Sequence, residues 1–197
     1  NDAIRFASQE GHYEVVKLLL RSSRVDPSDM NNEAIITASD NGHYEVVKLL
    51  LRSSRVDPSD DKNGAIRFAS RNGHYEIVKL LLSDSRVDPS DLNNNTIMTA
   101  SIYGHLKVAE LLLSDSRVDP SDDNNDAIRF ASGEGHSEVV KLLLSDSRVD
   151  PSYRNNDAIT SASENGHSEV VKLLLNDSRV LDKYLYTNIN TIDKKCQ

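Results

Sequence analysis

Six histidines are the residues of this chain whose type and regular spacing could do chemistry. Each follows a glycine, and they recur every 31 residues as His12, His43, His74, His105, His136 and His167. A period in this range is typical of stacked repeats. Metal ligands must converge to about 2 Å from one ion, whereas equivalent positions on stacked helices lie about 8–10 Å apart. We therefore predict that each histidine packs or hydrogen-bonds at a turn between helices and binds no metal.

Two sets of charged residues share this period and are predicted to form pairs that fix loops. They are the arginines Arg24, Arg55, Arg86, Arg117, Arg148 and Arg179, and the aspartates Asp26, Asp57, Asp88, Asp119 and Asp150. The alternative is a charged recognition strip. No Ser-His-Asp or Cys-His arrangement departs from the period, and the sequence has no glycine-rich phosphate loop. We therefore expect neither an enzyme nor a cofactor.

The bulk composition excludes several other classes of protein. The net charge is -8, and Lys and Arg occupy fixed repeat positions instead of clustering, which argues against a nucleic-acid partner. The only cysteine is Cys196, so no disulfide forms within the chain and a reducing compartment is favoured. No apolar run approaches the ~18 residues of a membrane span. We expect an intracellular, cytoplasmic protein.

One repeat encodes two short helices and a loop. Asp2 is predicted to cap a first helix that Gly11 ends, because aspartate accepts bonds from first-turn amides and glycine tolerates a positive φ. The apolar pattern after His12 predicts a second helix from Tyr13 to Leu20 or Arg21. Pro27 then places residues 24–28 in a loop. Helices this short need stacking to be stable.

These features resemble the ankyrin repeat over residues 1–180. The phrase GHYEVVKLLL at 11–20 and 42–51 is close to that family's second-helix signature. The resemblance implies an all-α, ankyrin-type helix-turn-helix solenoid with short hairpin loops. Its six stacked repeats would span approximately 1–28, 29–59, 60–90, 91–121, 122–152 and 153–180. The family repeat carries T-P-L-H where this chain has DAIR at 2–5. It is also usually 33 residues long, two more than here, so we expect a tighter hairpin. The 31-residue repeat sequence is similar to that of ankyrin proteins of giant DNA viruses.

A longer period of 62 residues runs through the first helices. Phe6, Phe68 and Phe130 alternate with Thr37, Thr99 and Ser161. We hypothesise that large and small side chains interdigitate along the stack. The alternative is an Arg-Phe stripe on the inner face, with Arg5, Arg67 and Arg129 beside the rings.

The resemblance implies protein binding through the concave face, at hairpin tips and the ends of first helices. Large apolar residues among polar ones are typical of binding hot spots. We therefore predict a contact centre at Leu92, Ile102 and Tyr103 with Arg71 beside it, and further contacts at Met30, Tyr153 and Arg154. The alternative for the fourth repeat is that its apolar residues pack on each other. The alternative function is a structural or adaptor segment of a larger protein whose activity lies in another domain.

The two ends depart from the repeat. Leu181, Tyr184, Leu185, Ile189 and Ile192 fall near one helical face, which predicts a capping helix within a tail at 181–197, or else a docking peptide. The first repeat shows interior-type residues with no preceding unit, so we expect a fragment of a longer array. The chain is predicted to be a monomer unless this uncapped repeat self-associates.

Overall fold

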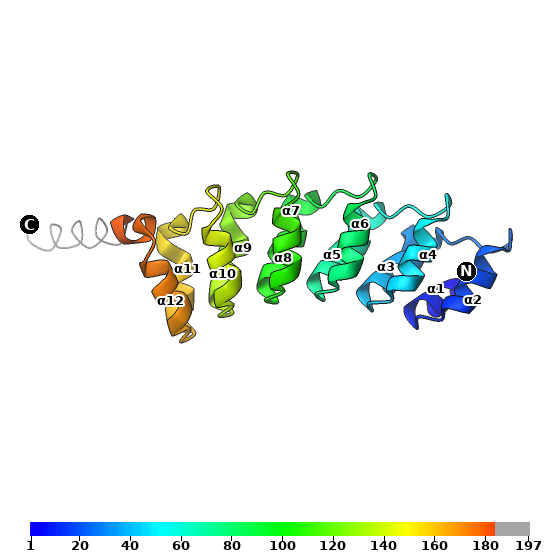
Figure 1. The fold of residues 1–197 in the computed structure, drawn as a ribbon, viewed down its shortest axis with the longest axis horizontal. Helices are drawn as coiled ribbons and strands as arrows, with labels where there is room; N and C mark the ends of the chain where they lie inside the picture. Colours follow the sequence, from blue (N-terminus) through cyan, green and yellow to red (C-terminus); the bar gives the residue numbers. More distant parts are fainter. Residues whose placement is uncertain (184–197) are drawn as a thin grey trace, which may run out of the picture.

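The computed structural model describes residues 1–183 and shows a row of stacked helix pairs (Figure 1). Each repeat supplies an odd-numbered first helix and an even-numbered second helix. No strand occurs within residues 1–183, which confirms the all-α prediction. The helices are α1 Asp2–Gln9, α2 Tyr13–Leu20, α3 Asp29–Asp40, α4 Tyr44–Leu51, α5 Asp60–Arg71, α6 Tyr75–Leu82, α7 Asp91–Ile102, α8 Leu106–Leu113, α9 Asp122–Gly133, α10 Ser137–Leu144, α11 Tyr153–Glu164 and α12 Ser168–Leu175.

The core is a strip that runs through the stack between first and second helices. In the second repeat, α3 buries Ile35 and its flanking alanines, α4 buries Val47 and Leu50, and the loop adds Val56. The predicted second helix of the first repeat, Tyr13 to Leu20, is confirmed. Neighbouring first helices pack more closely on each other than neighbouring second helices do. The first helices therefore line the inner side of the curved stack.

The loop tips form a turn that the sequence analysis did not foresee. Met30, Asn31 and Asn32 have φ values of 52°, 56° and 58°, so this stretch is one turn of left-handed backbone. The same conformation recurs at residues 61–63, 92–94, 123–125 and 154–156. Asparagine tolerates this conformation better than most residues do. The expected tight hairpin is thus a left-handed turn that leads directly into each first helix.

The predicted cap at Asp2 is wrong. Asp2 lies inside the first turn of α1, where it accepts a hydrogen bond from Arg5, and Asp126 of α9 accepts one from Arg129. The asparagine that precedes each of these positions has the structural role instead. Asn94 is buried, its Oδ1 accepts from the Asp119 amide at 2.8 Å, and its Nδ2 donates to Asp122 at 2.9 Å. The bond to Asp122 reaches the next repeat, and the bond from Asp119 comes from the loop that leads to it. Asn63 and Asn32 make the same two contacts one and two repeats earlier.

Five of the six histidines form hydrogen bonds, as predicted, and the acceptor lies in the preceding repeat. His105 donates from Nε2 to the carbonyl of Arg71, at the end of the preceding first helix, at 2.9 Å. His43, His74, His136 and His167 make the equivalent bond. Each ring also lies against the glycine of the preceding repeat. A Cβ added to Gly73 would come within 2.6 Å of His105.

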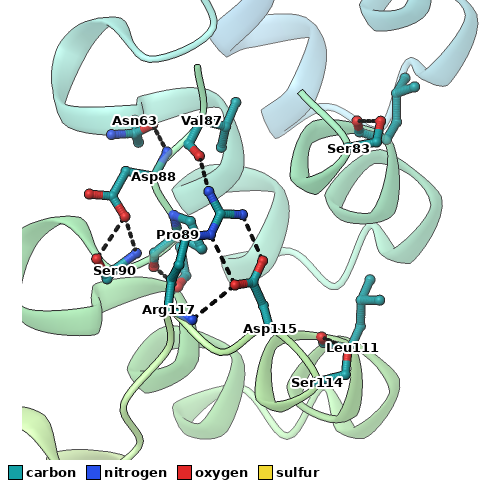
Figure 2. Close-up of polar contacts among 12 residues, drawn as sticks. Asn63, Ser83, Val87, Asp88, Pro89, Ser90, Leu111, Ser114, Asp115 and Arg117 are labelled. Atoms are coloured by element: carbon teal, nitrogen blue, oxygen red, sulfur yellow. Dashed lines mark hydrogen bonds and ion pairs between the residues drawn. The ribbon is translucent and has the colours of Figure 1, made fainter. Parts of the chain in front are cut away.

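The arginine and aspartate sets fix loops, but they do so separately (Figure 2). Arg117 donates from Nη1 to the Val87 carbonyl at 2.7 Å, and from Nε and Nη2 to Asp115 at 2.9 and 2.6 Å. Asp88 instead accepts from the amide and hydroxyl of Ser90 at 2.9 and 2.6 Å. The guanidinium of Arg117 lowers the pKa of Asp115 through this hydrogen bond. The prediction that the two sets pair with each other is therefore wrong.

The second repeat fixes its arginine differently. Serines stand at 22 and 53, where later repeats have aspartates such as Asp84. Arg55 accordingly donates to two carbonyls of the preceding repeat, Val25 at 2.6 Å and Leu20 at 2.9 Å.

The stack continues past α12 into helical residues 178–183. Val180 is buried, and Lys183 donates from Nζ to the Ser152 carbonyl at 2.8 Å. The predicted capping helix depends on Tyr184, Leu185, Ile189 and Ile192, which lie outside the described residues.

Candidate functional site

A shallow hollow of about 270 Å³ opens between the first helices of the third and fourth repeats. It is referred to below as the hollow. Arg67, Phe68 and Arg71 of α5 form one wall, and Asn95, Thr99, Ile102 and Tyr103 of or just after α7 form the other. The structure thus brings together three of the predicted contact residues: Arg71, Ile102 and Tyr103.

Helical spacing places these side chains on one face. Residues 67 and 71 are four apart on α5, and 95, 99 and 102 follow at intervals of four and three on α7. Ile66 and Ala69 of α5 point the other way and are buried. The core therefore holds the helix while leaving the opposite residues free for contact.

Guanidinium groups and rings alternate along the hollow. The Arg67 guanidinium carbon lies 5.5 Å from the centre of the Phe68 ring, and that of Arg71 lies 5.8 Å from the Tyr103 ring. Tyr103 also stacks on His105, with ring centres 6.3 Å apart. Each exposed cation–π contact is worth about 0.5–1 kcal/mol, which favours these rotamers before any ligand arrives.

The other predicted contact residues lie apart from the hollow. Leu92 is 40% exposed but sits in the left-handed turn, roughly 15 Å along α7 from Ile102. Met30 and Arg154 are also exposed residues of left-handed turns. Tyr153 begins α11, and its hydroxyl donates to Asn124 Oδ1 at 2.7 Å. The structure therefore separates the prediction into a hollow and a row of loop tips.

Phe6 and Phe130 are exposed on the first helices, whereas Phe68 is partly buried beside the hollow. Phe6 is 58% exposed and Phe130 is 39% exposed. An arginine lies over each ring: Arg5 at 6.0 Å from Phe6, and Arg129 at 5.5 Å from Phe130. The Arg-Phe contacts of the alternative stripe are therefore present, and interdigitation along the stack stays a hypothesis.

Sequence reasoning missed part of the hollow. Arg67 and Phe68 were weighed as members of the stripe, whereas Asn95 and Thr99 were not singled out as contact residues. Two spacings in the sequence, taken together, identify Arg67 and Phe68 as neighbours of the predicted contact residues. The 62-residue period marks Phe68, and four-residue helical spacing places Arg67 beside Arg71.

The hollow presents cationic, aromatic and polar side chains. The lining residues include two guanidiniums and no carboxylate. No group of three His, Cys, Asp or Glu side chains within residues 1–183 is placed to hold a metal ion. In the same part of the chain, no helix has both the length and the apolar character needed to cross a membrane.

Comparison with known families agrees with the repeat architecture. The family model described as ankyrin repeats (3 copies) matches residues 1–61, 35–125 and 97–185. A comparison with curated proteins finds no match. The three overlapping matches cover nearly all of the stack, and the chain belongs to the ankyrin-repeat family.

Proposed function

We propose that this chain is a non-catalytic module that binds one partner protein through its inner face, with the hollow as the centre of contact. Ankyrin repeats are generally protein-interaction modules, and their fold is typically non-enzymatic. The observation that carries the proposal is the group of Phe68, Arg71, Ile102 and Tyr103 around one hollow. Aromatic side chains and arginine dominate the energetics of protein interfaces.

The exposure of these residues supports the assignment. Tyr103 is 49% exposed, and its ring has enough apolar area to act as an anchor in an interface. The loop tips at Met30, Leu92, Tyr153 and Arg154 would form a second row of contacts on the same partner. The net charge of -8 favours a protein over a nucleic acid as that partner.

The test compares two double variants in affinity capture followed by quantitative mass spectrometry. Ile102→Ala with Tyr103→Ala removes the anchors of the hollow. Leu18→Ala with Leu175→Ala removes exposed apolar side chains from the second helices, and Leu18 is 62% exposed. A single hot-spot truncation costs about 2 kcal/mol or more, which is about 30-fold in affinity, so the double variant is expected to lose its partner by at least about 30-fold.

The control variant is expected to retain the partner. Circular dichroism of both variants checks that the helices persist. If both variants capture the same proteins as the wild type, the inner face is not the binding surface. A passive structural segment within a larger protein then becomes the better description.

A further inference from the structure

Arg67 differs from the equivalent arginines of two other repeats because it has no acidic partner. Arg5 lies between Asp2 and Glu33, with Nη1 2.8 Å from Asp2 and Nε 2.5 Å from Glu33. Arg129 likewise pairs with Asp126 and with Asp157, which accepts from Nε at 2.7 Å. Two of the three arginines in the stripe are therefore neutralised by carboxylates.

The sequence explains the difference. The acidic partners stand three residues before and 28 residues after each arginine. For Arg67 those positions hold Gly64 and Asn95, which carry no charge. The third repeat thus keeps the guanidinium, while Gly64 of the third repeat and Asn95 of the fourth replace the two carboxylates.

The remaining contacts of Arg67 leave its charge uncompensated. Its Nη1 donates to the carbonyls of Asp61 and Lys62 at 3.0 and 3.1 Å, and these acceptors are neutral. Its Nε is buried without a hydrogen-bond partner. Within residues 1–183, neither Arg67 nor Arg71 forms an ion pair.

Two unpaired guanidiniums thus lie one helical turn apart beside two aromatic rings, on a chain whose net charge is -8. Fork-shaped guanidinium groups match carboxylates in geometry and charge. We infer that the hollow binds an acidic segment of the partner protein. Asp or Glu side chains contact Arg67 and Arg71, and an adjacent apolar side chain packs on Phe68 and Tyr103. This inference rests on the proposed protein-binding function and names the chemistry of its ligand.

The chain itself shows what a carboxylate does at this position. Asp157 binds Arg129 from the position that Asn95 occupies relative to Arg67. Asn95→Asp therefore supplies an internal carboxylate in a setting that a neighbouring repeat already accommodates. This variant competes with an acidic ligand while it keeps the fold.

The test measures fluorescence anisotropy with three probes at low ionic strength. The first is a short peptide in which leucine stands between pairs of glutamates. The second has glutamine at each glutamate position, and the third is a short single-stranded oligothymidine. Arg67→Ala, Arg71→Ala and Asn95→Asp are compared with Lys79→Ala, which removes one exposed positive charge from α6.

The wild type and Lys79→Ala are expected to bind the glutamate peptide at least about fivefold more tightly than the glutamine peptide. The preference weakens as salt is added. Arg67→Ala, Arg71→Ala and Asn95→Asp each lose most of it. Equal affinity for both peptides, or no binding at roughly millimolar peptide, overturns the inference. So does an unchanged preference in Asn95→Asp, or tight binding of the oligonucleotide alone.

Failure here is distinguishable from failure of the proposed function. If partner capture depends on Ile102 and Tyr103 while the glutamate peptide shows no preference, the hollow binds a protein by apolar contact and only the acidic specificity is wrong. If capture is also insensitive to the hollow, the protein-binding assignment of this face fails with it.

Discussion

Replacement of Asn94 by alanine tests whether the repeat asparagines hold neighbouring repeats together. Its side chain is 5% exposed, accepts from the Asp119 amide at 2.8 Å and donates to Asp122 at 2.9 Å. Each bond contributes about 1 kcal/mol net to stability. The bond to the charged Asp122 contributes no more than this, because Asp122 is exposed to solvent. The backbone is left-handed here, with φ of 57°, and an alanine costs about 1 kcal/mol more than asparagine in that conformation.

Asn94→Ala is therefore expected to lower the free energy of unfolding by about 3 kcal/mol. Asn93 provides the matched control because it is exposed, has φ of 56° and makes no side-chain hydrogen bond within residues 1–183. Asn93→Ala should cost only the conformational part, about 1 kcal/mol. Asn94→Gly relieves that part but still loses both bonds, so it should stay about 2 kcal/mol below the wild type.

Urea unfolding followed by far-ultraviolet circular dichroism measures these differences. The slope of each transition should be unchanged, because the surface exposed on unfolding is the same. Equal losses in Asn94→Ala and Asn93→Ala would refute the reasoning. The asparagines would then serve the turn conformation alone.

Two further predictions concern the glycines and the loop ion pairs. Gly104→Ala should lower the free energy of unfolding by ~1–3 kcal/mol more than Gly166→Ala does. Both glycines have positive φ, but only a Cβ at Gly104 would collide with His136, at 2.6 Å. Thermal unfolding measures the difference, and equal shifts of the two midpoints would contradict this role of the histidine. Arg117 holds the pKa of Asp115 below its ordinary value, so this pair stabilises the fold above about pH 4 and the stabilisation is lost as the pH falls through the lowered pKa. The difference in urea midpoint between wild type and Asp115→Asn should accordingly be constant near neutral pH and shrink below about pH 4, and a difference independent of pH would contradict the prediction.

The repeat period predicted the helices because they depend on local signals. Apolar spacing and Gly11 are enough to place the helix at Tyr13–Leu20. The left-handed turns escaped prediction because non-glycine residues such as Met30 and Leu92 rarely adopt positive φ, and no glycine marks the position.

The candidate site could be predicted only in part for a related reason. Tyr103 and Ile102 stood out as departures from the repeat, and the structure places both at the hollow. The unpaired state of Arg67 depends on Asn95, which lies 28 residues away and faces it only after the repeats stack. Such a contact between repeats can be predicted from the sequence once the structure of one repeat pair shows how many residues separate the two partners.

The offsets of the polar bonds have a consequence for how such a chain changes in length. Asn94 reaches 25 and 28 residues forward, Arg117 reaches 30 residues back, and His105 reaches 34 residues back. The links of 28, 30 and 34 residues join adjacent repeats, and the link of 25 residues joins Asn94 to the loop that leads to the next repeat. Deleting or duplicating a whole 31-residue unit therefore brings an equivalent donor to each acceptor, whereas inserting a single residue breaks all the links that span it. Gene duplication can therefore change the number of repeats, while selection keeps the 31-residue repeat length constant. A ligand site formed by two neighbouring repeats is copied or lost together with that pair.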